Sequence, residues 1–375
     1  MVTIEEITHI SELQKLNHYW QMLIEYSNSD NLFVTYEWIS TWLKHFWKNK
    51  PILFLLVKNN NNNKPIGLAP FLIDQEKDRL IFPINAYSHR PDFVFISNKK
   101  ETLRIIFGYL KKKFKKFKLY LHEVETHSPL VQLLPDILTE CNLINIFKES
   151  HASPFLRITT DWQTYFKSKS RHFRSEQKRK LNKMKKAGQV NFVKVSKLNQ
   201  CNSAIEDILN IERNSWKEKT KTSFTAVPGL KDFYSDLAYI CAQNGWLQIY
   251  LLYFNSKPIA HIYGIVYKNK YYALKTSYHE SYKKLSPGVV LFNYALQDVF
   301  ESNLKEFDFL GVESRWKKEL ASDVRKHLDI FIYPRTPTTV FLQFYEHKFK
   351  PLVREKAPFI LELRKKIKNA FVERN

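Results

Sequence analysis

The chain contains 375 residues, of which 44% are hydrophobic and 15% aromatic, and this composition excludes a disordered or low-complexity protein. Its 59 basic and 37 acidic residues leave a formal net charge of +22, which predicts attraction to nucleic acid, nucleotide cofactors or an anionic membrane surface. The alternative is that the abundance of Lys, Asn and Ile is a compositional bias of the genome, without a function for the charge.

Cysteine spacing and apolar runs narrow the class of protein further. The three cysteines are widely spaced and form no CxxC pair, which excludes a disulfide framework and a cysteine-based zinc site. The longest apolar runs, such as 51–57, are far shorter than the roughly 20 residues that cross a bilayer. The first six residues lack the basic start of a signal peptide. We therefore expect a soluble cytoplasmic protein without a metal site, at most peripheral to the inner face of the membrane.

In the first half of the chain, hydrophobic periodicity predicts alternating helices and strands. Residues 31–48 carry apolar side chains at the i, i+3, i+4, i+7 spacing of an amphipathic helix. Further helices are expected at 101–116 and 128–140, and strands at 52–57, 65–73, 79–84, 92–96 and 118–124.

The second half opens with a helix of unusual charge. Half of the residues from 167 to 186 are Lys or Arg, and Phe173, Leu181 and Met184 form an apolar stripe, which favours packing on the rest of the molecule. Strands are then expected at 191–195, 246–254, 258–267, 270–278, 306–311 and 326–333, and helices at 202–218, 229–243 and 288–302. A basic amphipathic tail, 336–375, follows, suited either to an anionic membrane or to packing as a terminal helix.

A short motif recurs in the same structural context. A helix, an apolar strand and a polar turn precede Lys64-Pro65-Ile66-Gly67, and the same order precedes Lys257-Pro258-Ile259-Ala260. An internal duplication explains this better than chance does. We expect two related α/β lobes, residues 1–150 and 151–335, followed by the tail.

The turn after Tyr278 is the most informative local segment, because the chain lacks the common P-loop, dinucleotide-binding, zinc-protease and serine-hydrolase motifs. Lys283 and Lys284 precede Ser286-Pro287-Gly288, which opens an apolar helix. Free amide hydrogens at a helix start, a glycine and two lysines together favour a pyrophosphate site. The alternative is an ordinary strand–helix connection capped by Ser286.

The order of these segments resembles a known family. It is similar to the tandem Gcn5-related N-acetyltransferase (GNAT) proteins, specifically the CelD-like acyltransferases related to the FemABX aminoacyltransferases. The resemblance spans nearly the whole chain to about residue 335 and is carried by Trp38, 64–70, Asp92-Phe93, 171–188, Ser215-Trp216-Lys217, 257–260, 275–278, 286–288 and 308–311.

The resemblance implies an α/β (α+β) fold of two GNAT-like lobes, each a mixed, mostly antiparallel sheet flanked by helices. The C-terminal lobe would bind an acyl-CoA co-substrate through Tyr278, Lys283, Lys284, Leu285, Ser286, Pro287, Gly288 and Val289. The single-domain members of this fold usually have several glycines in this loop, whereas here only Gly288 remains. Tryptophan, Trp316, also stands where the family has a tyrosine.

Transfer to an amine requires a proton acceptor and a donor to the oxyanion, the latter commonly a strand N–H in this fold. The candidate bases are Asp308, Glu212, His279 and His261. Each also has a plainer interpretation: Glu212 on a solvated helix face, His261 as a core histidine and His279 as an inert loop residue. Asp308 faces the cleft if Phe307 and Phe309 face the core. The expected substrate-binding residues are Asp92, Trp216, Lys217, Lys275 and Lys317.

These observations predict an acyl-CoA-dependent N-acyltransferase that acts on an amino sugar, a lipid amine or an envelope precursor. A FemABX-like transferase with aminoacyl-tRNA as donor, and a non-catalytic binder of anionic lipid or nucleic acid, remain the alternatives. The basic helix 167–186 is either a solvated face or a grip on lipid, on the CoA 3′-phosphate or on tRNA.

Overall fold

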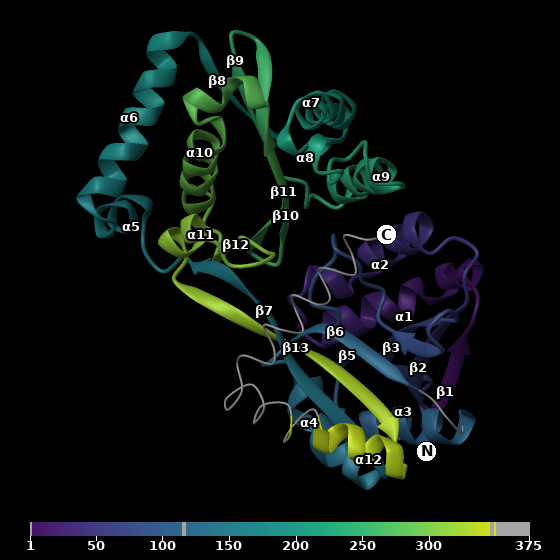
Figure 1. Ribbon diagram of the computed structural model, residues 1–375. Coiled ribbons are helices and arrows are strands. Elements are labelled where there is room, and N and C mark those ends of the chain that lie inside the picture. Colours follow the sequence, from purple (N-terminus) through teal and green to yellow (C-terminus); the bar gives the residue numbers. More distant parts are fainter. Residues whose placement is uncertain (1, 115–117, 346–348, 350–375) are drawn as a thin grey trace, which may run out of the picture.

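The computed structural model describes residues 2–114, 118–345 and 349. In this part of the chain one 13-stranded sheet runs through the whole molecule in the order β1-β2-β3-β4-β6-β13-β7-β12-β11-β10-β9-β8, with β5 paired to β3. Helices cover the sheet in two groups, which form two lobes joined by the long strands β7 and β13 (Figure 1). The expected mixed, mostly antiparallel α/β fold is confirmed.

The N-terminal lobe contains the strands β1 (Val2–Ile7), β2 (Ile52–Asn59), β3 (Lys64–Asp74), β4 (Arg79–Ile81), β5 (Val94–Phe95) and β6 (Leu119–Glu125). Its helices are α1 (Leu13–Tyr26), α2 (Tyr36–Phe46), α3 (Lys99–Lys113) and α4 (Pro129–Glu140). The two joining strands are β7 (Leu143–Arg157) and β13 (Asp323–Pro334).

The C-terminal lobe contains the strands β8 (Val190–Val195), β9 (Ile249–Phe254), β10 (Lys257–Tyr267), β11 (Lys270–Tyr278) and β12 (Glu306–Asp308). Its helices are α5 (Trp162–Ser168), α6 (Arg171–Ala187), α7 (Cys201–Arg213), α8 (Trp216–Lys219), α9 (Leu230–Gln243), α10 (Pro287–Glu301) and α11 (Arg315–Leu320). Helix α12 (Pro337–Phe344) follows β13.

The two lobes repeat one element order, and the repeated sequence motif falls at the same place in both. Lys64 opens β3 and Lys257 opens β10, each directly after a strand that pairs antiparallel to it. Both pairings shift register at the isoleucine of the motif, Ile66 and Ile259. A shared bulge at a shared position is what an internal duplication predicts.

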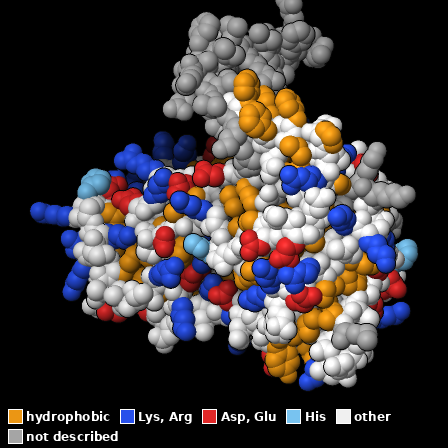
Figure 2. All heavy atoms as spheres, turned by 90° about the horizontal axis from the view of Figure 1, so that it is seen from below, with side chains coloured by type: hydrophobic (Ala, Val, Ile, Leu, Met, Phe, Trp, Pro, Cys, Tyr) orange, Lys and Arg blue, Asp and Glu red, His pale blue; other side chains and the backbone are white. Residues whose placement is uncertain are grey.

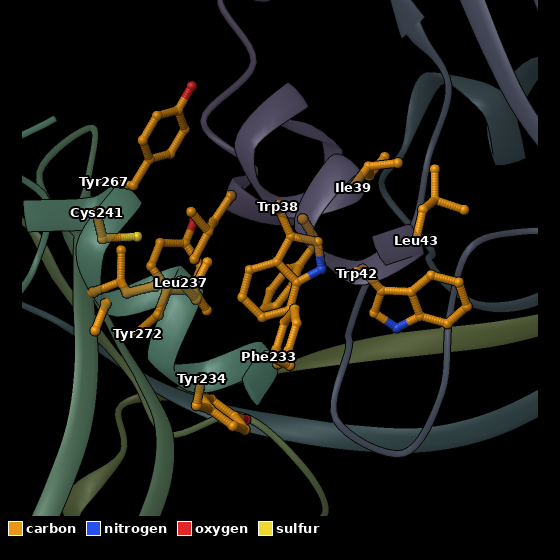
Figure 3. Close-up of a cluster of buried hydrophobic side chains, with 14 of the residues drawn as sticks. Trp38, Ile39, Trp42, Leu43, Phe233, Tyr234, Leu237, Cys241, Tyr267 and Tyr272 are labelled. Atoms are coloured by element: carbon orange, nitrogen blue, oxygen red, sulfur yellow. The ribbon is translucent and has the colours of Figure 1, made fainter. Parts of the chain in front are cut away.

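The lobes are also joined by a common core (Figure 3). Helix α2 contributes Trp38 and helix α9 contributes Phe233, whose rings lie edge to face with centroids 5.5 Å apart. The same cluster includes buried residues from α1, β2, α7 and β9, so apolar packing holds the two lobes together as one unit. The predicted domain boundary at residue 150 falls inside β7, which pairs with β13 on one side and β12 near its end.

Several expected elements differ in extent. The helix expected at 202–218 is two helices, α7 and α8, because Ser215 donates to the carbonyl of Glu212 and caps the N-terminus of α8. The strand expected at 306–311 ends at Asp308. Strand β7, strand β1 and helix α1 were not predicted. Of the predicted tail 336–375, residues 346–348 and 350–375 lie outside the described residues.

None of the helices in the described part of the chain combines the length and apolar character needed to span a bilayer. The basic residues do not gather in one patch on the face seen in Figure 2, where Lys and Arg side chains are interspersed with Asp and Glu.

Candidate acyl-transfer site

The C-terminal lobe opens where β11 and β12 separate. These parallel strands pair only from Lys270 with Glu306 to Tyr272 with Asp308, after which β12 ends and β11 continues to Tyr278. Strand β11 also carries a bulge: Tyr263 pairs with Lys275 and Gly264 with Ala273, which leaves Leu274 unpaired. A bulge increases local twist, and here it lies just where β11 leaves its neighbour.

The outer half of β11 therefore presents backbone groups to the gap. The amide of His279 donates to the carbonyl of Ile259, and antiparallel pairs alternate in the direction of their hydrogen bonds. It follows that Thr276 and Tyr278 direct their amide and carbonyl groups away from β10. The carbonyl of Thr276 accepts a hydrogen bond from Lys217 Nζ at 2.5 Å. The outward-facing amides of Thr276 and Tyr278 are N–H groups of the kind that stabilise an oxyanion.

A cavity of about 510 Å³ lies beside this segment, between α6, α10 and α11. We call it the α6–α10 cavity. It is lined by Phe173, Gln177, Lys180, Thr276, Tyr278, Lys283, Ser286, Pro287, Gly288, Val289, Phe292, Asn293, Leu296, Trp316, Glu319 and Leu320. Six of the eight residues expected to hold a cofactor are in this lining, whereas Lys284 and Leu285 are not. Its size is typical of small-molecule sites.

The N-terminus of α10 forms one wall of the cavity. Ser286 adopts a left-handed conformation with φ 54°, and its side chain makes no capping hydrogen bond, so the ordinary cap considered from the sequence is absent among the described residues. Pro287 occupies the first turn, where no amide hydrogen is needed. Lys183 of α6 donates to the carbonyl of Lys284 at 2.9 Å and so holds the loop against α6.

The basic helix α6 packs on the lobe as its apolar stripe predicted. Phe173 and Met184 are buried and Leu181 is partly buried. Its cavity-lining residues Phe173, Gln177 and Lys180 were not assigned to the site from the sequence, although the stripe indicated which face of the helix would be covered. Trp316 was noted only as a departure from the family, and it lines the cavity with its ring 4.8 Å from that of Phe292.

Glu212 is not on a solvated helix face, but fully buried among cations on the other side of β11. Its Oε1 lies 3.1 Å from His261 Nε2 and 3.6 Å from Lys217 Nζ, and its Oε2 lies 4.0 Å from Lys275 Nζ. Burial by itself would raise the pKa of Glu212, but the hydrogen bond from His261 and the two ammonium groups lower it to about 2. A carboxylate held in this way is a poor proton acceptor.

His261 and Lys275 have low pKa values for a shared reason. Burial lowers the pKa of His261, which is the hydrogen-bonded core histidine considered from the sequence. Burial also lowers the pKa of Lys275 to about 7. The ammonium of Lys275 donates to the carbonyl of Thr222 at 2.8 Å and lies between the rings of Phe224 and Tyr87, 4.6 and 5.0 Å from their centroids. Tyr87 belongs to the N-terminal lobe, so this cluster lies at the junction of the lobes.

The interpretation of Asp308 as a catalytic base conflicts with its environment. Asp308 is fully buried, 2.7 Å from Arg90 Nη2 and 3.1 Å from Arg325 Nη1, and its Oδ1 accepts from the amide of Leu310. Burial would raise the pKa of Asp308, but the two guanidinium groups lower it below the ordinary value. Its side chain therefore holds the end of β12 in place. Neither arginine was singled out from the sequence, because both come from distant segments.

The remaining candidates are dispersed. The Nδ1 atom of His279 accepts from the amide of Ser281, and burial lowers the pKa of this imidazole. Lys317 donates to the carbonyls of Leu310 and Val312 and so holds the loop that follows β12. Burial lowers the pKa of Lys317 to about 8. Trp216 is exposed at the start of α8. Asp92 lies in the N-terminal lobe, in a separate cavity of about 280 Å³.

Comparison with known proteins agrees with this geometry. Residues 171–318 match the family model of the acetyltransferase (GNAT) domain, a segment that contains α6, the divergence of β11 and β12, and the whole lining of the α6–α10 cavity up to Trp316. No curated protein sequence matches the chain.

Solved structures resemble the whole chain in fold. The crystal structure of FemX is 11% identical, with a TM-score of 0.57 over 91% of this chain and 99% of that one. L-PGS from Bacillus licheniformis is 10% identical, with a TM-score of 0.54 over 87% and 95%. The C-terminal DUF2156 domain of an Agrobacterium fabrum protein described as a lysylphosphatidylglycerol synthetase is 10% identical, with a TM-score of 0.55 over 88% and 94%. The two-lobed architecture is therefore shared by proteins of very different sequence.

Proposed function

We propose that this chain, whose residues 171–318 match the acetyltransferase (GNAT) domain, transfers an acyl group from a CoA thioester to an amine. The observation that carries the proposal is the α6–α10 cavity, where the uncapped start of α10 and Lys283 meet the outward-facing backbone of β11. Phosphates bind well at such a helix start because its amide hydrogens and dipole both favour negative charge.

Each residue of the α6–α10 cavity has its own role in this reaction. Gly288 leaves the first turn of α10 open, since an added Cβ would meet only the ring of Tyr278, at 3.4 Å. Lys283 neutralises the diphosphate, and Phe292 and Trp316 line the apolar part of the cavity. The amide groups of Thr276 and Tyr278 donate to the thioester oxygen as it gains charge. Attack by the amine then forms the amide bond and breaks the C–S bond, and the leaving thiolate takes up the proton that the amine loses.

The acceptor approaches from the other side of β11, where Lys217 and Lys275 lie. The ammonium of Lys217 lies 2.5 Å from the carbonyl of Thr276, on the backbone that would carry the thioester, and the ammonium of Lys275 shares the carboxylate of Glu212 with it. The pair suits an acceptor with a phosphate or carboxylate beside its amine. Of the acceptors considered from the sequence, those that carry such a group meet this description: a phosphorylated amino sugar, a phospholipid amine or an anionic envelope precursor. The fold shared with a domain described as a lysylphosphatidylglycerol synthetase supports including lipids.

The decisive experiment is calorimetric titration with acetyl-CoA and longer acyl-CoAs. We predict that Lys283→Glu weakens binding by more than about tenfold, or about 1.4 kcal/mol, because the reversed charge faces the diphosphate. Lys284→Glu is the matched control: it changes the net charge equally, but Lys284 does not line the cavity. We expect it to alter affinity by no more than about threefold. Equal effects of the two variants, or no binding of any acyl-CoA, would reject the site.

A second donor, aminoacyl-tRNA, is favoured by one specific observation. The opposite side of α6, together with α5, lines a groove of about 570 Å³ that contains two aromatic and four basic side chains: Trp162, Gln163, Phe166, Lys167, Arg171, Arg174, Ser175 and Lys178. Aromatic rings and cations in one groove suit single-stranded RNA. Filter binding to aminoacyl-tRNA at two salt concentrations distinguishes the donors. Tight binding that falls steeply with salt, without acyl-CoA binding, would favour the RNA donor.

A further inference from the structure

A group of potential metal ligands lies away from the acyl-transfer site, near the junction of the lobes. His89 Nδ1 lies 2.9 Å from Glu123 Oε1, and His151 Nε2 lies 2.8 Å from the same oxygen. One ligand atom from each residue lies within 4.8 Å of the other two. Among the described residues, this is the group in which three His, Cys, Asp or Glu side chains come close enough to share a metal ion. The sequence predicts no metal site, and none of these three residues is a candidate ligand from the sequence alone.

The backbone is bulged on both sides of β13 to bring these side chains together. Opposite the single residue Asp329, strand β6 has two residues, His122 and Glu123, and Glu123 adopts a φ of +60°. Opposite His327, strand β7 likewise has two residues, Ser150 and His151. Bulges re-aim side chains, and a glutamate in the left-handed region is strained. Two bulges and one strained residue thus converge on a single carboxylate.

The contacts inside the group leave ligand atoms available. His151 Nε2 is buried and close to Glu123 Oε1, yet the pair lacks hydrogen-bond geometry. His327, only 2% exposed, donates from Nδ1 to the carbonyl of His151, while its Nε2 has no partner among the described residues. Buried polar atoms without partners are rare and call for an explanation such as an ion.

The distances also suit a common ion. Ligands at about 2.1 Å from a tetrahedral ion lie roughly 3.4 Å apart, so the two observed contacts need to open by about half an ångström. Two imidazoles and one carboxylate are a ligand set of zinc and other first-row transition ions, whereas magnesium and calcium prefer oxygen alone. The side chains of His89 and His151 are 14% and 25% exposed, which leaves a route for an ion to enter.

We propose that His89, Glu123 and His151 bind one divalent transition-metal ion, with zinc as the preferred ion. The site connects three separate segments: the loop after β4, strand β6 and strand β7. Arg90, next to His89, forms the buried ion pair with Asp308 at the end of β12. The ion therefore fixes the loop that links the N-terminal lobe to the strand end beside the acyl-transfer site. Its role is structural and independent of the identity of the donor.

The test is metal binding by the full-length protein after treatment with a chelator. We expect about one equivalent of Zn²⁺ to remain after gel filtration, Co²⁺ to give a visible spectrum of nitrogen and oxygen ligation, and either ion to raise the melting temperature. His89→Ala and His151→Ala should each weaken affinity by more than about 100-fold, because loss of a ligand exceeds the effect of losing an outer partner. His172→Ala, which removes an exposed histidine of α6, is the matched control and should bind as the wild type does.

Glu123→Gln preserves the shape of the side chain and keeps the proposal testable if an alanine variant does not fold. Circular dichroism of each metal-free variant shows whether it is folded. Absence of bound zinc in the folded wild type would overturn the proposal and leave a hydrogen-bonded His–Glu–His group. Equal affinity in wild type and Glu123→Gln would overturn it as well.

Discussion

At the scale of single residues, Asp92 combines a buried carboxyl group with two nearby donors. Ser128 Oγ donates to Oδ2 at 2.5 Å and the amide of Phe93 donates to Oδ1 at 2.8 Å. Burial nevertheless raises the pKa of Asp92 from 3.8 to about 7, because these two hydrogen bonds only partly offset the loss of water. Asp92 belongs to the N-terminal lobe, where it faces a cavity lined also by Arg90 and Glu125.

This pKa predicts a pH dependence of stability. Between pH 3.8 and about 7 the folded protein keeps the proton that the unfolded chain loses, so the stability due to Asp92 is complete below pH 3.8 and is lost as the pH rises through about 7. In urea unfolding, the wild type should therefore lose more stability from pH 5 to pH 8 than Asp92→Asn. The exposed Glu76→Gln is the control and should follow the wild type. Identical pH profiles for wild type and Asp92→Asn would contradict the raised pKa.

At the scale of elements, the β10–β11 pair shapes the acyl-transfer site. Gly264 lies at the register shift of this pair, directly beneath the buried ring of Tyr271. A Cβ at Gly264 would fall 2.0 Å from the hydroxyl oxygen of Tyr271 and 2.2 Å from its Cζ. No side-chain rotation of a fully packed tyrosine relieves such a clash, so glycine is required for this close approach.

Gly264→Ala should therefore destabilise the protein by about 1–3 kcal/mol, the usual effect of overpacking, and weaken acyl-CoA binding by displacing β11. Gly108→Ala is the control: Gly108 is exposed in α3 and a Cβ there meets nothing within 4 Å. We expect it to stabilise the fold by about 0.5–1 kcal/mol through helix propensity. Chemical unfolding measures both effects. A neutral Gly264→Ala would show that Tyr271 is able to move aside.

At the scale of the whole molecule, two kinds of ion pair connect the lobes. Arg90 of the N-terminal lobe pairs with Asp308 of β12, and both side chains are almost fully buried. Lys44 of α2 pairs with Asp236 of α9 at 2.6 Å, but the Lys44 side chain is 65% exposed. Removal of one partner from a buried pair leaves an uncompensated charge, whereas an exposed pair contributes little.

Arg90→Met should consequently lower the free energy of unfolding by up to about 3–5 kcal/mol, and by a smaller amount if Arg325 still compensates the charge of Asp308. Lys44→Met should lower it by less than about 1 kcal/mol. Because the lobes share the core around Trp38 and Phe233, both variants should still unfold in one transition. Denaturation followed by tryptophan fluorescence and by circular dichroism tests this. Two separate transitions in Arg90→Met would show that the ion pair, and not the core, couples the lobes.

The sequence by itself determined those features that depend on neighbouring residues. The spacing of apolar residues located α2, α6, α9, α10 and most strands, and Ser286-Pro287-Gly288 with Lys283 indicated the segment that lines the α6–α10 cavity. The repeated Lys-Pro-Ile motif indicated the repeated element order. These are local signals, because periodicity and turn chemistry act over a few residues.

Only the tertiary structure decided which charges meet. The sequence pattern places Asp308 in a cleft, whereas in the folded protein it is buried against Arg90 and Arg325. The pattern is compatible with an exposed Glu212, whereas in the folded protein it contacts Lys275 and His261. The extent of the long strand β7 and its bulge at His151 likewise depend on pairing with β13 and β12. The reason is physical: burial and long-range pairing set the protonation and availability of a side chain, and neither has a period along the chain.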